Sequence, residues 1–135
     1  MLHHQTYFLQ NDALRLGEYT LCGARGWKQR GAENFDAQDE KVFLRELERL
    51  KLSIAAAKKI GGRLIGISHY PPFSQNHGRS EFSDLYAEAG VEKVVYGHLH
   101  GPRIKKEEYE NLCIDGVQYY LTSCDYLDFC LKQIA

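Results

Sequence analysis

Several features that would direct the function of this 135-residue chain are missing. No apolar run is long enough to cross a bilayer, and the amino terminus lacks the charged-then-apolar pattern of a signal peptide. The formal net charge is only -1, and no basic face stands out, so nothing indicates a nucleic-acid partner. These absences predict a cytoplasmic protein that binds neither membranes nor nucleic acids.

Cysteine is also sparse and irregularly spaced. The four cysteines, at positions 22, 113, 124 and 130, form no Cys-x-x-Cys pair, which argues against a zinc finger or a dithiol redox motif. Reduced thiols of this kind are typical of the cytosol. A content of 44% hydrophobic and 26% charged residues is ordinary for one globular domain, so residues 1–135 are treated as a single domain.

Proline is the third scarcity, and its placement is informative. The chain has three prolines, Pro71, Pro72 and Pro102, and all lie within a few residues of a histidine. Pro102 closes the segment Gly97-His98-Leu99-His100-Gly101, which follows an apolar run at 91–96. In extended backbone, residues i and i+2 point to the same side, so His98 and His100 are predicted to face one metal ion or two adjacent ions. Two surface histidines in a glycine-bounded turn are an equally open interpretation.

A second segment repeats the pattern. The apolar run 63–68 ends at His69, and Tyr70, Pro71 and Pro72 follow at once. Residues 80–90 between the two runs predict a short helix with a serine cap and a glycine stop. A strand, a helix and a strand joined by a right-handed crossover place both strands in parallel. We therefore expect His69 to converge with His98 and His100 at one sheet edge.

The remaining elements predict an α/β protein with a mixed sheet. Short strands are expected at 5–9, 14–16 and 19–23, and a long amphipathic helix is expected from Ala37 to the glycines at 61–62. The Asp115-Gly116 turn joins segments 111–114 and 117–121 into a carboxyl-terminal β-hairpin.

Other side chains are candidates for a supporting role. Arg25 is placed to contact a phosphate, although a structural arginine is the alternative. His77, in a polar loop, is either a residue of a substrate entrance or a solvated loop histidine. Asp125 either orients a ligand imidazole or serves a turn. Together with Tyr70, Arg25 and His77 form the expected substrate-binding set.

The segments Ser68-His69-Tyr70-Pro71-Pro72 and Gly97-His98-Leu99-His100 resemble the last two signature motifs of the calcineurin-like metallophosphoesterases. The flanking residues 23–27 and 121–127 resemble a bacterial subgroup of predicted phosphohydrolases in that superfamily. The resemblance implies the carboxyl-terminal half of an αββα sandwich, so that residues 1–135 would form one partial domain.

The resemblance also implies chemistry. It predicts hydrolysis of a small-molecule phosphoester at two divalent ions, with manganese, iron or zinc favoured by imidazole ligands. His69 and His98 would bind one ion, and His100 would bind the other.

The family's first motifs, Asp-x-His, Gly-Asp-x-x-Asp and Gly-Asn-His followed by an acid, do not occur here. These motifs supply the carboxylates and the catalytic histidine, so no catalytic residue is assigned. The chain is interpreted as a truncated form that is weakly active or inactive. Missing partner strands would leave an apolar face and a sheet edge open, which predicts self-association.

Two other hypotheses remain open. The chain is a non-catalytic phosphoesterase-fold scaffold that binds a protein partner, or it holds a single zinc ion through three histidines and a water.

Overall fold

A six-stranded mixed β-sheet with the order β1-β2-β3-β4-β6-β5 organises the chain in the computed structural model, which describes residues 6–135. The strands β2 (Tyr19–Ala24), β3 (Arg63–Ser68), β4 (Lys93–Tyr96) and β6 (Val117–Leu121) run parallel to one another. The edge strands β1 (Leu14–Leu16) and β5 (Leu112–Ile114) are antiparallel to their neighbours.

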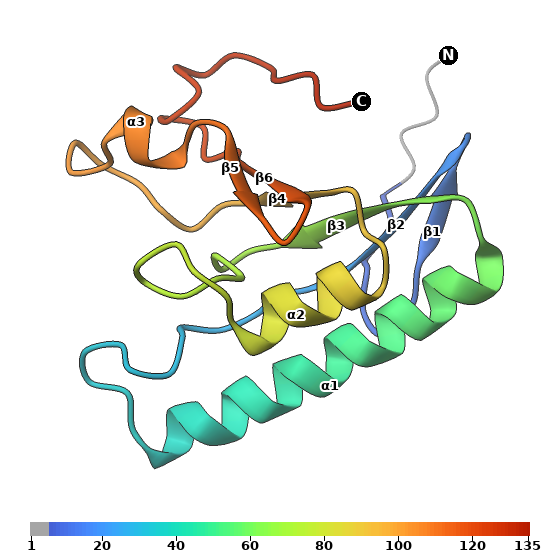
Figure 1. Cartoon of the computed structure of the whole chain (residues 1–135), viewed down its shortest axis with the longest axis horizontal. Coiled ribbons are helices and arrows are strands. Elements are labelled where there is room, and N and C mark those ends of the chain that lie inside the picture. Colours follow the sequence, from blue (N-terminus) through green and yellow to red (C-terminus); the bar gives the residue numbers. More distant parts are fainter. Residues whose placement is uncertain (1–5) are drawn as a thin grey trace.

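Two helices, α1 (Ala37–Ile60) and α2 (Glu81–Glu88), lie on the same face of the sheet (Figure 1). The strand order explains this arrangement, because β2, β3 and β4 follow one another in one direction. Right-handed crossovers, which parallel strands almost always adopt, then place both connecting helices on one face. Helix α1 begins after a capping box formed by Asp36 and Asp39, and α2 begins after one formed by Ser80 and Ser83. A third helix, α3 (Lys106–Tyr109), is a single turn.

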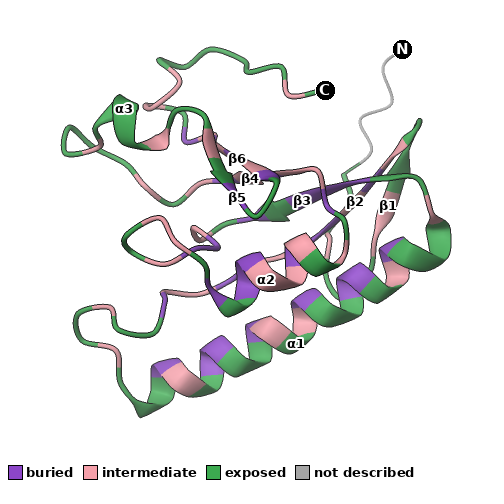
Figure 2. Cartoon of the chain, viewed as in Figure 1, coloured by how far each residue is buried: buried purple, intermediate pink, exposed green. Residues whose placement is uncertain are grey.

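The core fills the space between the sheet and the two helices. Phe43 and Leu50 of α1 and Val94 of β4 are fully buried there (Figure 2). Gly66 of β3 has no room for a side chain, because a Cβ atom would lie 2.6 Å from the ring of Tyr86 in α2. Burial of Cys22 raises the pKa of its thiol to about 12, so this cysteine is an unreactive part of the core.

The α/β class, the parallel βαβ unit, the long helix and the carboxyl-terminal hairpin are confirmed. The strand expected at 5–9 is wrong: residues 6–9 have no regular structure, and Gln5 lies outside the described residues. The apolar residues Tyr7, Phe8 and Leu9 did not make a strand, because no neighbouring strand pairs with that segment. No helix within residues 6–135 is both long and apolar enough to span a membrane.

Among residues 6–135, neither α1 nor α2 covers the opposite face of the sheet. Leu21, Ile67, Val95 and Tyr120 alternate with the core residues of their strands, so their side chains lie on this face. Ile67 is 36% exposed. The carboxyl-terminal segment passes on this side, where the Ile134 carbonyl accepts a hydrogen bond from Lys93 Nζ (Figure 1). Ile65, which points the same way as Ile67, is buried, so the face is partly covered.

We expect the purified chain to self-associate through this face. The two edge strands are three residues each, too short to template extensive strand pairing, whereas this face presents exposed Ile67 beside half-buried Leu21 and Val95. In sedimentation velocity, the weight-average mass should rise with concentration, and Ile67→Lys should restore a monomer. The matched change Leu44→Lys, on the exposed side of α1, should leave the association unchanged. A wild-type chain that stays monomeric at every concentration would contradict this prediction.

A second prediction concerns Asp39 in the first turn of α1. Its carboxylate accepts hydrogen bonds from Lys28 Nζ at 2.7 Å, from the backbone N–H of Asp36 at 3.0 Å and from Trp27 Nε1 at 3.0 Å. The first two contacts in particular lower the pKa of Asp39 to about 2. Because an unfolded aspartate titrates near ~3.9, this stabilisation is complete above that pH and is lost as the pH falls towards 2.

Asp39→Asn should therefore lower the urea midpoint at pH 7 and have a much smaller effect at pH 2.5. An equal decrease of the urea midpoint at both pH values would show that the charge of Asp39 does not contribute to stability.

Candidate functional site

Three loops meet at the carboxyl ends of β2, β3 and β4, and backbone hydrogen bonds join them. The Arg25 carbonyl accepts from the N–H groups of His69 at 3.1 Å and Tyr70 at 3.0 Å. The His69 carbonyl in turn accepts from the Gly97 N–H at 3.1 Å. Residues from separate crossovers are thereby held in fixed register at the edge where parallel sheets commonly bind ligands.

His69 and His98 face one another across this edge. His69 Nε2 lies 3.1 Å from His98 Nδ1. Two nitrogens bound to one ion at about 2.1 Å, with an angle of roughly 90° to 109° between them, are about 3.0 to 3.4 Å apart. The observed separation therefore fits two ligands of one metal ion, as well as a hydrogen bond between neutral imidazoles.

The electrostatics favour the form of His98 that binds metals. Partial burial lowers the pKa of His98, and the neighbouring His69 and His100 lower it further. A neutral imidazole has a lone pair for a cation, whereas a protonated one repels it.

His98 occupies an unusual backbone conformation. Its φ is +69°, and the Leu99 N–H donates to the Gly97 carbonyl at 2.8 Å, which closes a three-residue turn around it. A histidine in this region is strained, and such strain gathers at functional sites. The turn directs the ring of His98 against Tyr70, with ring centroids 4.2 Å apart.

The turn also corrects the sequence-based geometry. A common direction of His98 and His100 requires extended backbone, and His98 is not extended, so this prediction is wrong. His98 points to His69, whereas His100 points to Asp125.

Asp125 contacts the imidazole of His100 and also lies in a turn. His100 Nδ1 donates to Asp125 Oδ1 at 2.8 Å, while the carboxylate also accepts from the N–H groups of Gly101 and Tyr126. The Gly101 N–H first, and His100 next, hold the pKa of Asp125 below its usual value, so it stays ionised. The contact fixes the His100 tautomer and leaves Nε2 free, an arrangement that commonly supports metal ligands.

Only one compact group of three metal-binding side chains occurs within residues 6–135. The ligand atoms of His100, Cys124 and Asp125 all lie within 4.8 Å of one another. The His69–His98 pair has no third such neighbour among those residues, so a single zinc bound by three histidines would require side chains to move. No carboxylate in this part of the chain joins the pair.

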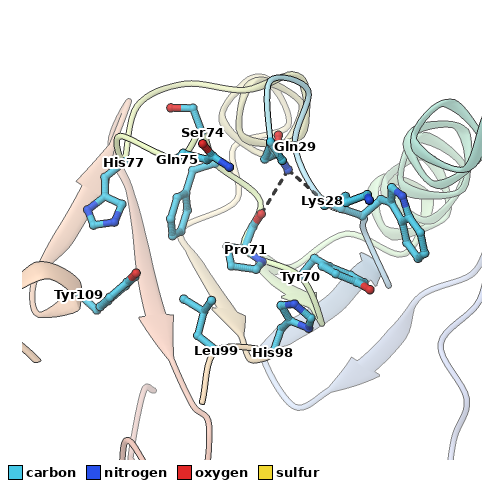
Figure 3. Close-up of a pocket in the computed structure, with 13 residues that line it drawn as sticks. Lys28, Gln29, Tyr70, Pro71, Ser74, Gln75, His77, His98, Leu99 and Tyr109 are labelled. Atoms are coloured by element: carbon cyan, nitrogen blue, oxygen red, sulfur yellow. Dashed lines mark hydrogen bonds between the residues drawn. The ribbon is translucent and has the colours of Figure 1, made fainter. Parts of the chain in front are cut away.

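A cavity of about 290 Å³ opens beside His98 (Figure 3). Tyr70 and His77, both expected to bind substrate, line it together with His98. Tyr109 also lines it, although nothing in the sequence singled out this residue. Its contact with His77, with ring centroids 5.0 Å apart, joins distant segments and leaves no local signal in the sequence.

Arg25 does not line this cavity. Its guanidinium lies 3.3 Å from the buried carboxylate of Glu46 and 4.7 Å from the centroid of the Trp27 ring. Glu46 also pairs with Arg49 at 2.8 Å. Arg25 thus takes part in an ion-pair network between β2 and α1. This position agrees with the alternative prediction, a structural arginine.

Comparison with known proteins gives no relative: no family model, no curated protein and no solved structure matches the chain. The function must therefore be argued from the site itself.

Glycine usually destabilises a protein more than alanine does, but the strain at His98 predicts the opposite order at this position. His98→Gly should be more stable than His98→Ala by about 1 kcal/mol, because only glycine adopts this φ without steric cost. At His100, which does not have a positive φ, the glycine variant should be the less stable of the pair. Urea unfolding of the four variants without metal measures both differences. A more stable alanine variant at position 98 would show that the turn is not strained.

Proposed function

We propose that this chain supplies one wall of a divalent-metal centre for phosphoester hydrolysis. The observation that carries the proposal is the His69–His98 pair, 3.1 Å apart and held by a strained turn where parallel strands end. In this assignment His69 and His98 bind one ion, and His100 binds a second through Nε2.

The three imidazoles and the residues around them are suitable for binding divalent metal ions. Neutral imidazoles favour manganese, iron or zinc over magnesium. Asp125 holds His100 in one tautomer, and Tyr70 packs against the ring of His98. Paired ions of this kind activate a water for attack on phosphorus and neutralise charge on the phosphoryl oxygens.

The three histidines do not complete a two-metal centre by themselves. A pair of close cations needs bridging negative charge, and none of residues 6–135 places a carboxylate beside both His69 and His98. The carboxylate ligands and the proton donor for the leaving group would come from another polypeptide segment. We therefore expect these 135 residues alone to turn over a phosphoester barely faster than the metal in buffer.

A second candidate function is a scaffold that binds a protein partner without catalysis. The sheet face opposite α1 and α2, on which Ile67 is exposed and Leu21 and Val95 are half-buried, favours it. The two functions differ in one respect: a scaffold does not need the histidines to bind metal.

Isothermal titration calorimetry with Zn²⁺ or Mn²⁺, followed by inorganic phosphate, tests the proposal. The wild-type chain should bind metal, and phosphate should bind only after the metal. His98→Ala should weaken metal binding at least tenfold, because it removes one of two ligands of the first ion. His77→Ala is the matched control, since this imidazole lies in the cavity and is not assigned to a metal.

Equal metal binding by the wild type and by a His69→Ala/His98→Ala/His100→Ala variant would contradict the metal assignment. Rapid metal-dependent hydrolysis of an aryl phosphate by the chain alone, abolished in His98→Ala, would contradict its incompleteness.

A further inference from the structure

We infer that the cavity beside His98 binds a planar aromatic ring carried by the phosphoester, such as a nucleobase or an aryl leaving group. This inference rests on the proposed function, because it places the phosphate at the histidine end of the cavity. It adds the chemical class of the group attached to that phosphate.

Aromatic side chains form both ends of the cavity. His77 and Tyr109 lie at one end and Tyr70 and His98 at the other, with Leu99 between them (Figure 3). Trp27 contacts Tyr70, with ring centroids 5.2 Å apart, and Phe73 contacts His77 at 5.6 Å. Such ring faces are stacking surfaces for a flat, unsaturated group.

Two of the three lysine and amide side chains that line the cavity are already engaged, and the third, Gln75, is exposed to solvent. Lys28, the lining lysine, pairs with Asp39 at 2.7 Å and donates to the Asn34 carbonyl at 3.2 Å. Gln29 Nε2 donates to the carbonyls of Trp27 and Pro71. The part of the cavity away from His98 therefore suits an uncharged group better than a second phosphate or a sugar rich in hydroxyls.

Some polar atoms remain for recognition of a ring edge. No hydrogen bond within the described residues engages the imidazole of His77 or the hydroxyl of Tyr109. Burial raises the pKa of Tyr109, so its hydroxyl stays protonated and can donate. A heterocycle with ring nitrogens would offer acceptors to these groups.

The size of the cavity limits the ligand. A volume of about 290 Å³ lies at the lower end of small-molecule sites. It accommodates one ring system, and a polymer would extend out of it. The expected ligand is thus a mononucleotide or a simple aryl phosphate.

Trp27 provides a direct measurement, because it is the single tryptophan of the chain and it lines the cavity. Its fluorescence, excited at a wavelength that nucleobases do not absorb, is followed on the Zn²⁺-loaded chain. The titrants are adenosine 5′-monophosphate, phenyl phosphate and ribose 5-phosphate. Adenosine is titrated into the same chain with and without zinc.

The phosphates that carry a ring should bind about tenfold or more tightly than ribose 5-phosphate, which lacks one. Tyr109→Leu should remove this advantage without changing the affinity for ribose 5-phosphate. Tyr109→Phe keeps the ring and should keep the advantage of phenyl phosphate, but it should weaken the nucleotide, whose ring nitrogens lose the hydroxyl donor. Tyr19→Leu is the matched control, because Tyr19 begins β2 and so lies at the end of the strand away from the site. It should not change the affinity for any of the three phosphates. A preference for the nucleotide over phenyl phosphate assigns the ring as a nucleobase, and the reverse assigns an aryl group.

The outcomes separate the two proposals. If all three phosphates bind equally and Tyr109→Leu changes nothing, the inference is overturned while the metal centre stands. If no phosphate binds with zinc but adenosine quenches Trp27 in a Tyr109-dependent manner, the aromatic site stands and the proposed function fails. If neither adenosine nor any ring-bearing phosphate binds, the inference is overturned.

Discussion

The site depends on the backbone hydrogen bonds that join three loops at one end of the sheet. The Arg25 carbonyl holds the start of the His69 loop, and the His69 carbonyl holds Gly97. Each crossover contributes one loop, and the parallel register of β2, β3 and β4 brings their ends to the same level. Without this register, His69 and His98 would belong to unrelated surface loops.

Two features at this edge of the sheet are energetically unfavourable: the strained backbone of His98 and the buried carboxylate of Glu46. His98 is held at positive φ, although most residues of the sheet and helices adopt relaxed conformations. Nearby, Glu46 is buried between β2 and α1, and it is compensated by Arg25 and Arg49. A buried carboxylate of this kind requires its partners, which explains why the guanidinium groups of Arg25 and Arg49 lie against Glu46. Rigid surroundings of this kind keep the histidine pair in place.

Local sequence patterns predict the secondary structure correctly where helix caps, glycine stops and apolar runs occur together. The capped helix that ends at Gly61 and the strand–helix–strand unit around His69 and His98 could be predicted, as could the convergence of those two histidines. The turn at His98 could not, because a hydrogen bond between Leu99 and Gly97 overrides the alternation of an extended chain. The aromatic contact of Tyr109 and the ion pair of Arg25 with Glu46 were equally hidden, since both join segments remote in sequence. No local pattern encodes such contacts.

The central claim is that the imidazoles at this edge are metal ligands, and nitrogen NMR of the histidine rings tests it most directly. Spectra of ¹⁵N-labelled chain, recorded before and after addition of Zn²⁺, report the state of each ring nitrogen. The account predicts that zinc shifts His69 Nε2, His98 Nδ1 and His100 Nε2, while His100 Nδ1 keeps its proton on Asp125. Unchanged ring nitrogens of His69 and His98 at saturating zinc would contradict the account, and the 3.1 Å contact would then be only a hydrogen bond between two histidines.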